Sequence, residues 1–98
     1  MRKDKHFVEA LEKIKECLDK KSFKGVAYLF GSSIRDDYLA TSDIDIAIYT
    51  PDKKIITILR TEFEDLNIPY KIDLIDLSEV SWDFRNQVIN QGIILWKS

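Results

Sequence analysis

Ser42-Asp43-Ile44-Asp45-Ile46-Ala47-Ile48 is the most informative segment of the chain, and ten residues separate its first aspartate from the pair Gly31-Ser32 upstream. The segment is predicted to be a strand, in which successive side chains point to opposite faces of a sheet. The carboxylates of Asp43 and Asp45 therefore project to the same side, where they need a cation between them. Mg²⁺ takes oxygen ligands and often lies between carboxylates and substrate phosphates. The segment thus predicts a site for a metal-bound nucleotide.

Gly31-Ser32 has the chemistry of a phosphate site. Gly31 has no Cβ, so a phosphate can approach its backbone, and Ser32 adds a hydroxyl and an amide at a predicted helix start, where anions are favoured. Other motifs do not fit. No Gly-Lys-Ser/Thr follows at the spacing of a P-loop, and the three glycines of the chain are too widely spaced for a dinucleotide fingerprint. A calcium loop starting at Asp43 would need glycine in place of Ile48 and glutamate in place of Lys54.

The segments around these motifs predict alternating helices and strands. Apolar residues at helical spacing mark two amphipathic helices, and short apolar runs mark the strands. The order predicts an α/β fold with a small mixed central sheet flanked by helices, in which strand directions are left open. The expected elements are a helix from Asp4 to Lys20, strands over Val26–Phe30 and Asp43–Tyr49, a short helix within Ser32–Asp37, a helix from Asp52 to about Asn67, a strand over Tyr70–Leu77, a last helix opened by Asp76-x-x-Glu79 and closed by Gly92 at its C′ position, and a terminal strand or tail at Ile93–Trp96. The strand at Val26–Phe30 is expected to be buried on both faces.

Composition limits the possible functions. The 98 residues suffice for one domain over residues 1–98, so an acceptor for group transfer is expected to come from another molecule. Fifteen basic and 17 acidic residues give a net charge of −2, which argues against strong nucleic-acid binding. The single Cys17 fits a reducing compartment, and neither a signal peptide nor a membrane-spanning segment is visible. We therefore expect a cytoplasmic protein without a membrane partner.

Gly31-Ser32 followed at this spacing by Asp43-Ile44-Asp45 resembles the signature of the DNA polymerase β nucleotidyltransferase superfamily. The glycine follows an apolar strand and the paired acids open the next one, as that signature requires. The chain is most similar to the minimal nucleotidyltransferases, the MntA-like antitoxins encoded beside a HEPN-domain partner. The likeness continues through Asn67–Asp76 and Trp82-Asp83-Phe84-Arg85. The resemblance implies a palm-like nucleotidyltransferase fold.

The resemblance also implies roles for individual residues. Asp43 and Asp45 would be metal ligands, and Asp73 would be the third carboxylate and metal ligand. Gly31 and Ser32 would hold the triphosphate, with Arg35 as a basic residue that contacts phosphate. Two-metal chemistry supports Asp73 independently, since an acidic residue on a neighbouring strand is needed near both ions.

The implied reaction is the transfer of a nucleoside monophosphate to a hydroxyl with release of pyrophosphate. The substrate would be ATP or another nucleoside triphosphate, with two Mg²⁺ ions as cofactors. The acceptor would be a tyrosine of a HEPN toxin with which the chain forms a hetero-oligomer, so that the toxin is neutralised.

Other interpretations stay open. Each acidic residue could be a solvated surface carboxylate, Ser32 could simply cap a helix, and Arg35 could be solvated. Ser33, Asp36 and Asp37 depart from the family pattern, and two added negative charges near a triphosphate would repel it unless they point away. These departures favour an alternative in which a non-catalytic subunit of the same fold inhibits its partner by binding alone. Transfer to a small molecule, as in aminoglycoside-modifying enzymes, ranks last because those enzymes carry an extra helical domain.

Overall fold

The computed structural model describes residues 4–34 and 43–98, apart from the side chain of Ser32. Helices and strands follow the predicted order almost throughout. The elements are α1 (Lys5–Lys20), β1 (Val26–Leu29), the 3₁₀ segment η1 (Gly31–Ser33), β2 (Ile44–Tyr49), α2 (Lys53–Glu64), β3 (Ile72–Asp76), α3 (Trp82–Gln91) and β4 (Ile93–Lys97). Of the short helix expected within Ser32–Asp37, only η1 is observed, and residues 35–37 lie outside the described part.

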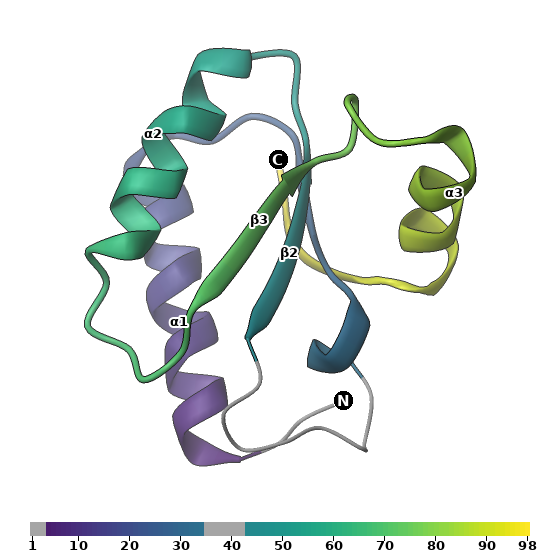
Figure 1. Cartoon of the computed structure of the whole chain (residues 1–98). Coiled ribbons are helices and arrows are strands. Elements are labelled where there is room, and N and C mark those ends of the chain that lie inside the picture. Colours follow the sequence, from purple (N-terminus) through teal and green to yellow (C-terminus); the bar gives the residue numbers. More distant parts are fainter. Residues whose placement is uncertain (1–3, 35–42) are drawn as a thin grey trace.

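The four strands form one mixed sheet in the order β3-β2-β1-β4 (Figure 1). β1 is antiparallel to both of its neighbours, whereas β2 and β3 are parallel. The expectation of a small mixed central sheet is therefore confirmed. The parallel pair is joined through α2, which is the kind of crossover that parallel neighbours require.

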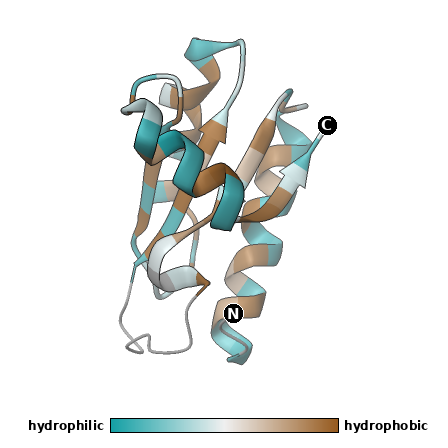
Figure 2. Cartoon of the chain, turned by 90° about the vertical axis from the view of Figure 1, so that its right-hand side faces the viewer, coloured by the Kyte–Doolittle hydropathy of each residue, from teal (hydrophilic) through white to brown (hydrophobic). Residues whose placement is uncertain are grey.

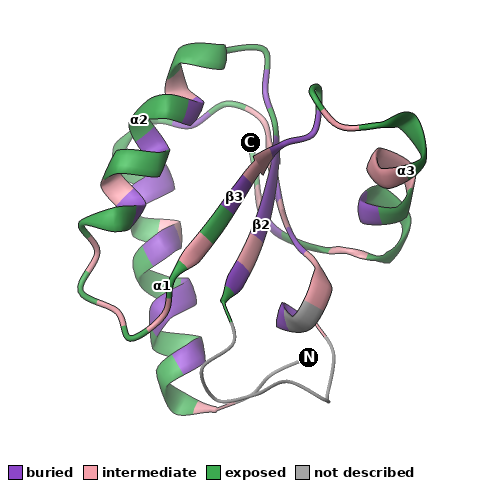
Figure 3. Ribbon diagram, in the orientation of Figure 1, coloured by how far each residue is buried: buried purple, intermediate pink, exposed green. Residues whose placement is uncertain are grey.

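The two faces of the sheet are covered unequally. α1 and α2 lie against one face and enclose the larger core, whose fully buried members include Phe7, Ile14, Leu18, Ile44, Ile46, Ile48 and Leu59. α3 lies against the other face, over a smaller cluster built on Ala47, Leu77 and Val88. Val88 is the only buried residue of α3, and most of this helix is exposed in Figure 3. Among the described elements, α3 therefore covers only part of its face of the sheet.

The partial cover by α3 corrects one expectation about β1. Ala27 and Leu29 point into the larger core and are buried, but Val26 and Tyr28 are only partly buried. The strand is therefore not buried on both faces as predicted. Its apolar composition is that of a central strand, but no helix in the described part of the chain covers all of its second face.

Side-chain caps fix the starts of the three α-helices. Asp4 accepts a hydrogen bond from the Phe7 amide. Asp52 accepts one from the Lys54 amide and is the cap that the sequence predicts. The predicted start of the last helix is wrong, because Ser81 caps α3 by accepting from the Phe84 amide. Asp76 instead ends β3 and is held in the turn that follows.

Gly92 ends α3 with extended backbone angles and not in the left-handed conformation expected of a C′ glycine. A Cβ at this position would lie 2.5 Å from the Val88 carbonyl oxygen and 3.0 Å from that of Leu29. Glycine is therefore required because two backbones approach closely where the chain turns from α3 into β4. Within the described residues, no helix is both long and apolar enough to cross a membrane.

Candidate functional site

The beginnings of β2 and β3 bring two of the predicted site residues together. Asp45 pairs in register with Asp73 across the parallel ladder, and the Ile44 amide donates to the Lys71 carbonyl at 2.9 Å. Ile44 and Ile46 are completely buried on the α1/α2 side, so Asp45 projects from the opposite face. Residues paired across neighbouring strands share a face, which places both carboxylates on the side of α3.

The two carboxylates differ in exposure. Asp45 is partly buried and Asp73 is exposed. Like charges directly opposite each other on neighbouring strands are destabilising. A divalent cation removes this repulsion, and carboxylate oxygens are the ligands that Mg²⁺ prefers. The donor set at this edge therefore fits the group that the sequence predicts.

Gly31 lies against the carboxylate of Asp45. Its φ of +63° is left-handed, and a Cβ built on it would lie 2.6 Å from Asp45 Oδ2. Any larger residue would be strained and would also displace that carboxylate. The absent side chain lets the backbone of Gly31 lie directly against the Asp45 carboxylate, and the contact of Gly31 with phosphate stays a prediction.

Ser33 positions Asp45 from the other side. Its side chain is fully buried, and its Oγ accepts a hydrogen bond of 2.9 Å from the Asp45 amide. The Phe30 amide also donates to the Asp45 carbonyl at 3.2 Å. The η1 segment is thus fastened to β2 at the residue that carries the carboxylate. In the sequence Ser33 is only a departure from the family pattern, and nothing there distinguishes this buried serine from a solvated loop residue.

Asp43 precedes β2 and is exposed. Among the described residues, no group of three or more His, Cys, Asp or Glu side chains is arranged to hold a metal ion. The structure therefore brings together Asp45, Asp73 and Gly31, whereas the three-carboxylate cluster that includes Asp43 stays a prediction. Arg35 lies outside the described residues, and so does the side chain of Ser32.

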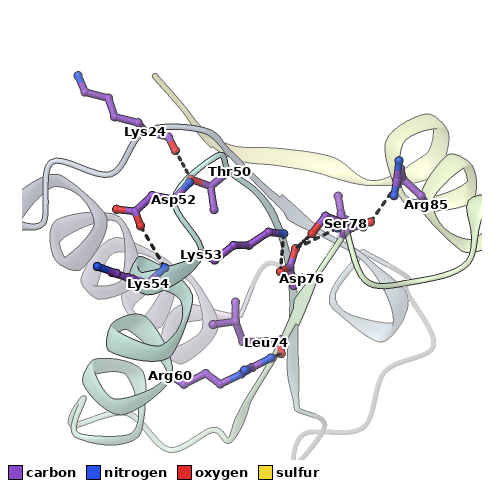
Figure 4. A network of polar contacts seen from close by, with 11 residues as sticks. Lys24, Thr50, Asp52, Lys53, Lys54, Arg60, Leu74, Asp76, Ser78 and Arg85 are labelled. Carbon is purple, nitrogen blue, oxygen red and sulfur yellow. Dashed lines mark hydrogen bonds and ion pairs between the residues drawn. The ribbon is translucent and has the colours of Figure 1, made fainter.

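Asp76 lies on the other face of β3 and belongs to a separate polar network (Figure 4). Its Oδ2 accepts a hydrogen bond of 2.8 Å from Lys53 Nζ, and its Oδ1 accepts from the amide and hydroxyl of Ser78. Burial alone would raise the pKa of the Asp76 carboxyl, but the contacts with Lys53 and Ser78 outweigh it and hold that pKa below its ordinary value. Asp76 is therefore a structural carboxylate.

Residues 12–98 match the family model described as Polymerase beta, Nucleotidyltransferase. The chain belongs to the polymerase β nucleotidyltransferase family. A comparison with curated proteins finds no match. The match to the family confirms the fold that the Gly-Ser and Asp-x-Asp signature implied.

Solved structures of similar chains are nucleotidyltransferases and toxin–antitoxin complexes. A chain in the crystal structure of a toxin–antitoxin with AMP-PNP is 30% identical, with a TM-score of 0.70 over 90% of this chain and 73% of that one. A chain in a complex of the tri-AMPylated Shewanella oneidensis HEPN toxin with MNT antitoxin is 28% identical, with a TM-score of 0.65 over 94% of this chain and 73% of that one. A putative nucleotidyltransferase from Sulfolobus solfataricus is 25% identical, with a TM-score of 0.50 over 99% and 92% of the respective chains.

Proposed function

We propose that this nucleotidyltransferase transfers AMP from ATP to a hydroxyl group in a Mg²⁺-dependent reaction. The acceptor hydroxyl belongs to a tyrosine of a HEPN toxin, and the protein acts as the antitoxin of that toxin. The observation that carries the proposal is the alignment of Asp45 with Asp73 beside the left-handed Gly31. Family membership supports nucleotidyl transfer. The similar chains in a complex with AMP-PNP and in a complex with a tri-AMPylated HEPN toxin support the donor and the partner.

Asp43, Asp45 and Asp73 would hold the metal. Mg²⁺ would neutralise the triphosphate and lower the pKa of the attacking hydroxyl. The backbone at Gly31 and Ser32 would bind the phosphates, with Arg35 adding a positive charge. Two-metal sites stabilise in-line displacements in phosphoryl-transfer enzymes, and these carboxylates would supply ligands for a pair of Mg²⁺ ions.

The transfer itself forms one bond and breaks one. The acceptor oxygen bonds to the α-phosphorus, the bond from this phosphorus to the bridging oxygen breaks, and pyrophosphate leaves with that electron pair. The proton of the acceptor hydroxyl passes to the carboxylate of Asp73, which is exposed on the open face of the sheet. The chain's own residues thus position the donor and receive the proton, and the partner supplies the acceptor.

Labelled ATP tests the proposal directly. The purified protein, Mg²⁺ and the HEPN protein encoded by the adjacent gene should give label on the partner. Asp43→Ala and Asp45→Ala should abolish the labelling. Asp19→Asn is a control, because Asp19 is an exposed aspartate of α1 on the other side of the molecule. Absence of labelling by the wild-type protein, or equal labelling by the two alanine variants, contradicts the proposal.

A second candidate function is inhibition of the partner by binding alone. It is favoured by the absence of a three-acid metal cluster among the described residues and by the acidic pair Asp36-Asp37 in the sequence. Calorimetry separates the two functions. A protein that only binds would form the complex with its partner and would show no Mg²⁺-dependent binding of ATP.

A further inference from the structure

A cavity of about 200 Å³ opens between η1 and the C-terminal half of α3. In Figure 2, α3 crosses this face of the molecule with η1 just below it. The cavity shares Gly31 with the carboxylate site, since a Cβ on this glycine would collide with Asp45 Oδ2. Its walls are formed by Phe30, Gly31, Ile34, Phe84, Gln87, Val88, Gln91 and Gly92.

The described residues that line this cavity are uncharged, and all are apolar except Gln87 and Gln91, which carry amides. The rings of Phe30 and Phe84 meet edge to face, with centroids 5.8 Å apart, and the buried Val88 lies beside them. Gln87 and Gln91 are exposed and lie one helical turn apart, so their side chains emerge on the same side of α3. Among the described residues, neither a basic nor an acidic one lines the cavity. It therefore suits a flat, uncharged group with hydrogen-bonding edges and does not suit a phosphate.

We propose that this cavity binds the adenine base of the nucleotide, and that Gln87 and Gln91 read the edge of the base. The inference rests on the proposed function, because it assigns the base end of the same substrate. Glutamine amides can pair with the N6 and N7 positions of adenine through one donor and one acceptor. In other proteins, apolar and aromatic side chains form the surfaces on which flipped-out bases or the bases of single-stranded nucleic acids stack.

Size and position agree with this assignment. Pockets that enclose a whole small ligand measure roughly 300–1,000 Å³, so a cavity of about 200 Å³ fits one part of a nucleotide. With the base between η1 and α3, the sugar and phosphates extend past Gly31 toward Asp45 and Asp73. The α-phosphate then reaches the carboxylates that the proposed reaction needs.

The larger cavity, of about 400 Å³, does not serve this purpose. It lies between α1 and α2, on the far side of the sheet from Asp45, and is lined by charged residues such as Lys13, Lys20 and Glu62. Burial, together with the neighbouring carboxylate of Glu62, raises the pKa of the Cys17 thiol that faces it, which disfavours a reactive thiolate there. It shares no residue with the carboxylate site.

Mg²⁺-dependent nucleotide binding, measured by calorimetry, tests the base site without an acceptor. The wild-type protein should bind ATP more tightly than GTP, CTP or UTP. Gln87→Ala and Gln91→Ala should weaken ATP binding about tenfold each and should leave the affinity for inorganic triphosphate unchanged. Asn90→Ala is the matched control, because Asn90 is an exposed amide of α3 outside the cavity. Since all three side chains are exposed, the variants should keep the wild-type melting temperature.

The possible outcomes separate the two proposals. Loss of ATP preference in the glutamine variants, with wild-type binding of triphosphate, supports the base site. ATP binding with the same affinity and preference in all variants overturns the base site and leaves the proposed function standing. Failure of the wild-type protein to bind any nucleotide overturns both.

Discussion

The two aspartates of β3 have opposite surroundings. Asp76, at the end of the strand, is buried on the α2 side and accepts hydrogen bonds from Lys53 and Ser78. Asp73, near its start, is exposed on the α3 side and faces Asp45, another carboxylate. Among the described residues, none forms an ion pair or hydrogen bond with the Asp73 carboxylate. The fold thus neutralises the carboxylate of Asp76 and leaves that of Asp73 exposed beside Asp45.

Asp73→Asn should give the largest effect on activity. If Asp73 holds the metal as proposed, its loss removes several kcal/mol of transition-state stabilisation, so AMP transfer should fall about a thousandfold. Stability without Mg²⁺ should stay equal or rise by up to about 1 kcal/mol, because a like-charge pair across two strands is removed. Transfer rates and urea unfolding measure the two effects.

The effect of Mg²⁺ on unfolding gives a second test of the role of Asp73. A cation that binds only the folded protein stabilises it by mass action. Mg²⁺ should therefore raise the unfolding midpoint of the wild-type protein and of Asp19→Asn, and should raise that of Asp73→Asn much less. Wild-type transfer and a wild-type response to Mg²⁺ in Asp73→Asn would remove Asp73 from the site.

Asp76→Ala should have the opposite effects to Asp73→Asn, with a loss of stability and unchanged transfer. The free energy of unfolding should fall by about 2 kcal/mol, because the buried contacts with Lys53 and Ser78 are lost. The loss stays below that of a fully buried pair, since the side chain of Lys53 is 52% exposed and returns to water. Transfer per folded molecule should stay unchanged, and Glu79→Ala, an exposed residue of the same turn, is the control for urea unfolding. Loss of transfer in the folded variant would mean that both aspartates of β3 serve the reaction.

Periodicity and local motifs were sufficient to predict most elements of the fold. The helical spacing of Phe7, Leu11, Ile14 and Leu18 predicts α1, and all four residues are buried. The alternation in β3 correctly places Leu74 in the larger core and Ile75 in the smaller one. Strand order and direction could not be predicted, because they depend on pairing between residues far apart in the chain.

The prediction is wrong where a residue that can cap a helix makes another contact instead. Asp76 and Ser81 are both good helix caps, and the sequence does not reveal that Lys53 and Ser78 already engage Asp76. Ser33 supports Asp45 through a hydrogen bond between residues 12 positions apart in the sequence, and no local sequence pattern predicts such a contact. The amides of Gln87 and Gln91 line a cavity only because η1 packs beneath α3. Sequence alone therefore predicts a candidate site at Asp45, Asp73 and Gly31, which the structure places together, but it does not predict the residues that support them.

The smallest expected effect is a pH dependence of stability that comes from Asp76. In an unfolded chain aspartate has a pKa of about 3.9, whereas contacts with Lys53 and Ser78 that outweigh burial keep the pKa of Asp76 lower in the folded protein. The folded state therefore binds fewer protons, so this stabilisation is complete above the unfolded pKa and is lost as the pH falls through the folded pKa.

Lys53→Met tests this dependence, because it removes the side-chain contact that most lowers the pKa of Asp76. At neutral pH the variant should be less stable by about 1 kcal/mol, a modest loss because half of the Lys53 side chain is exposed. Below about pH 4 the difference should shrink, since protonated Asp76 no longer attracts an ammonium group. Lys54→Met is the control, as Lys54 is exposed and forms no ion pair with a described residue. Urea unfolding at several pH values from 7 to 3 gives the comparison, and a constant difference across that range would show that Lys53 acts through packing and not through the charge of Asp76.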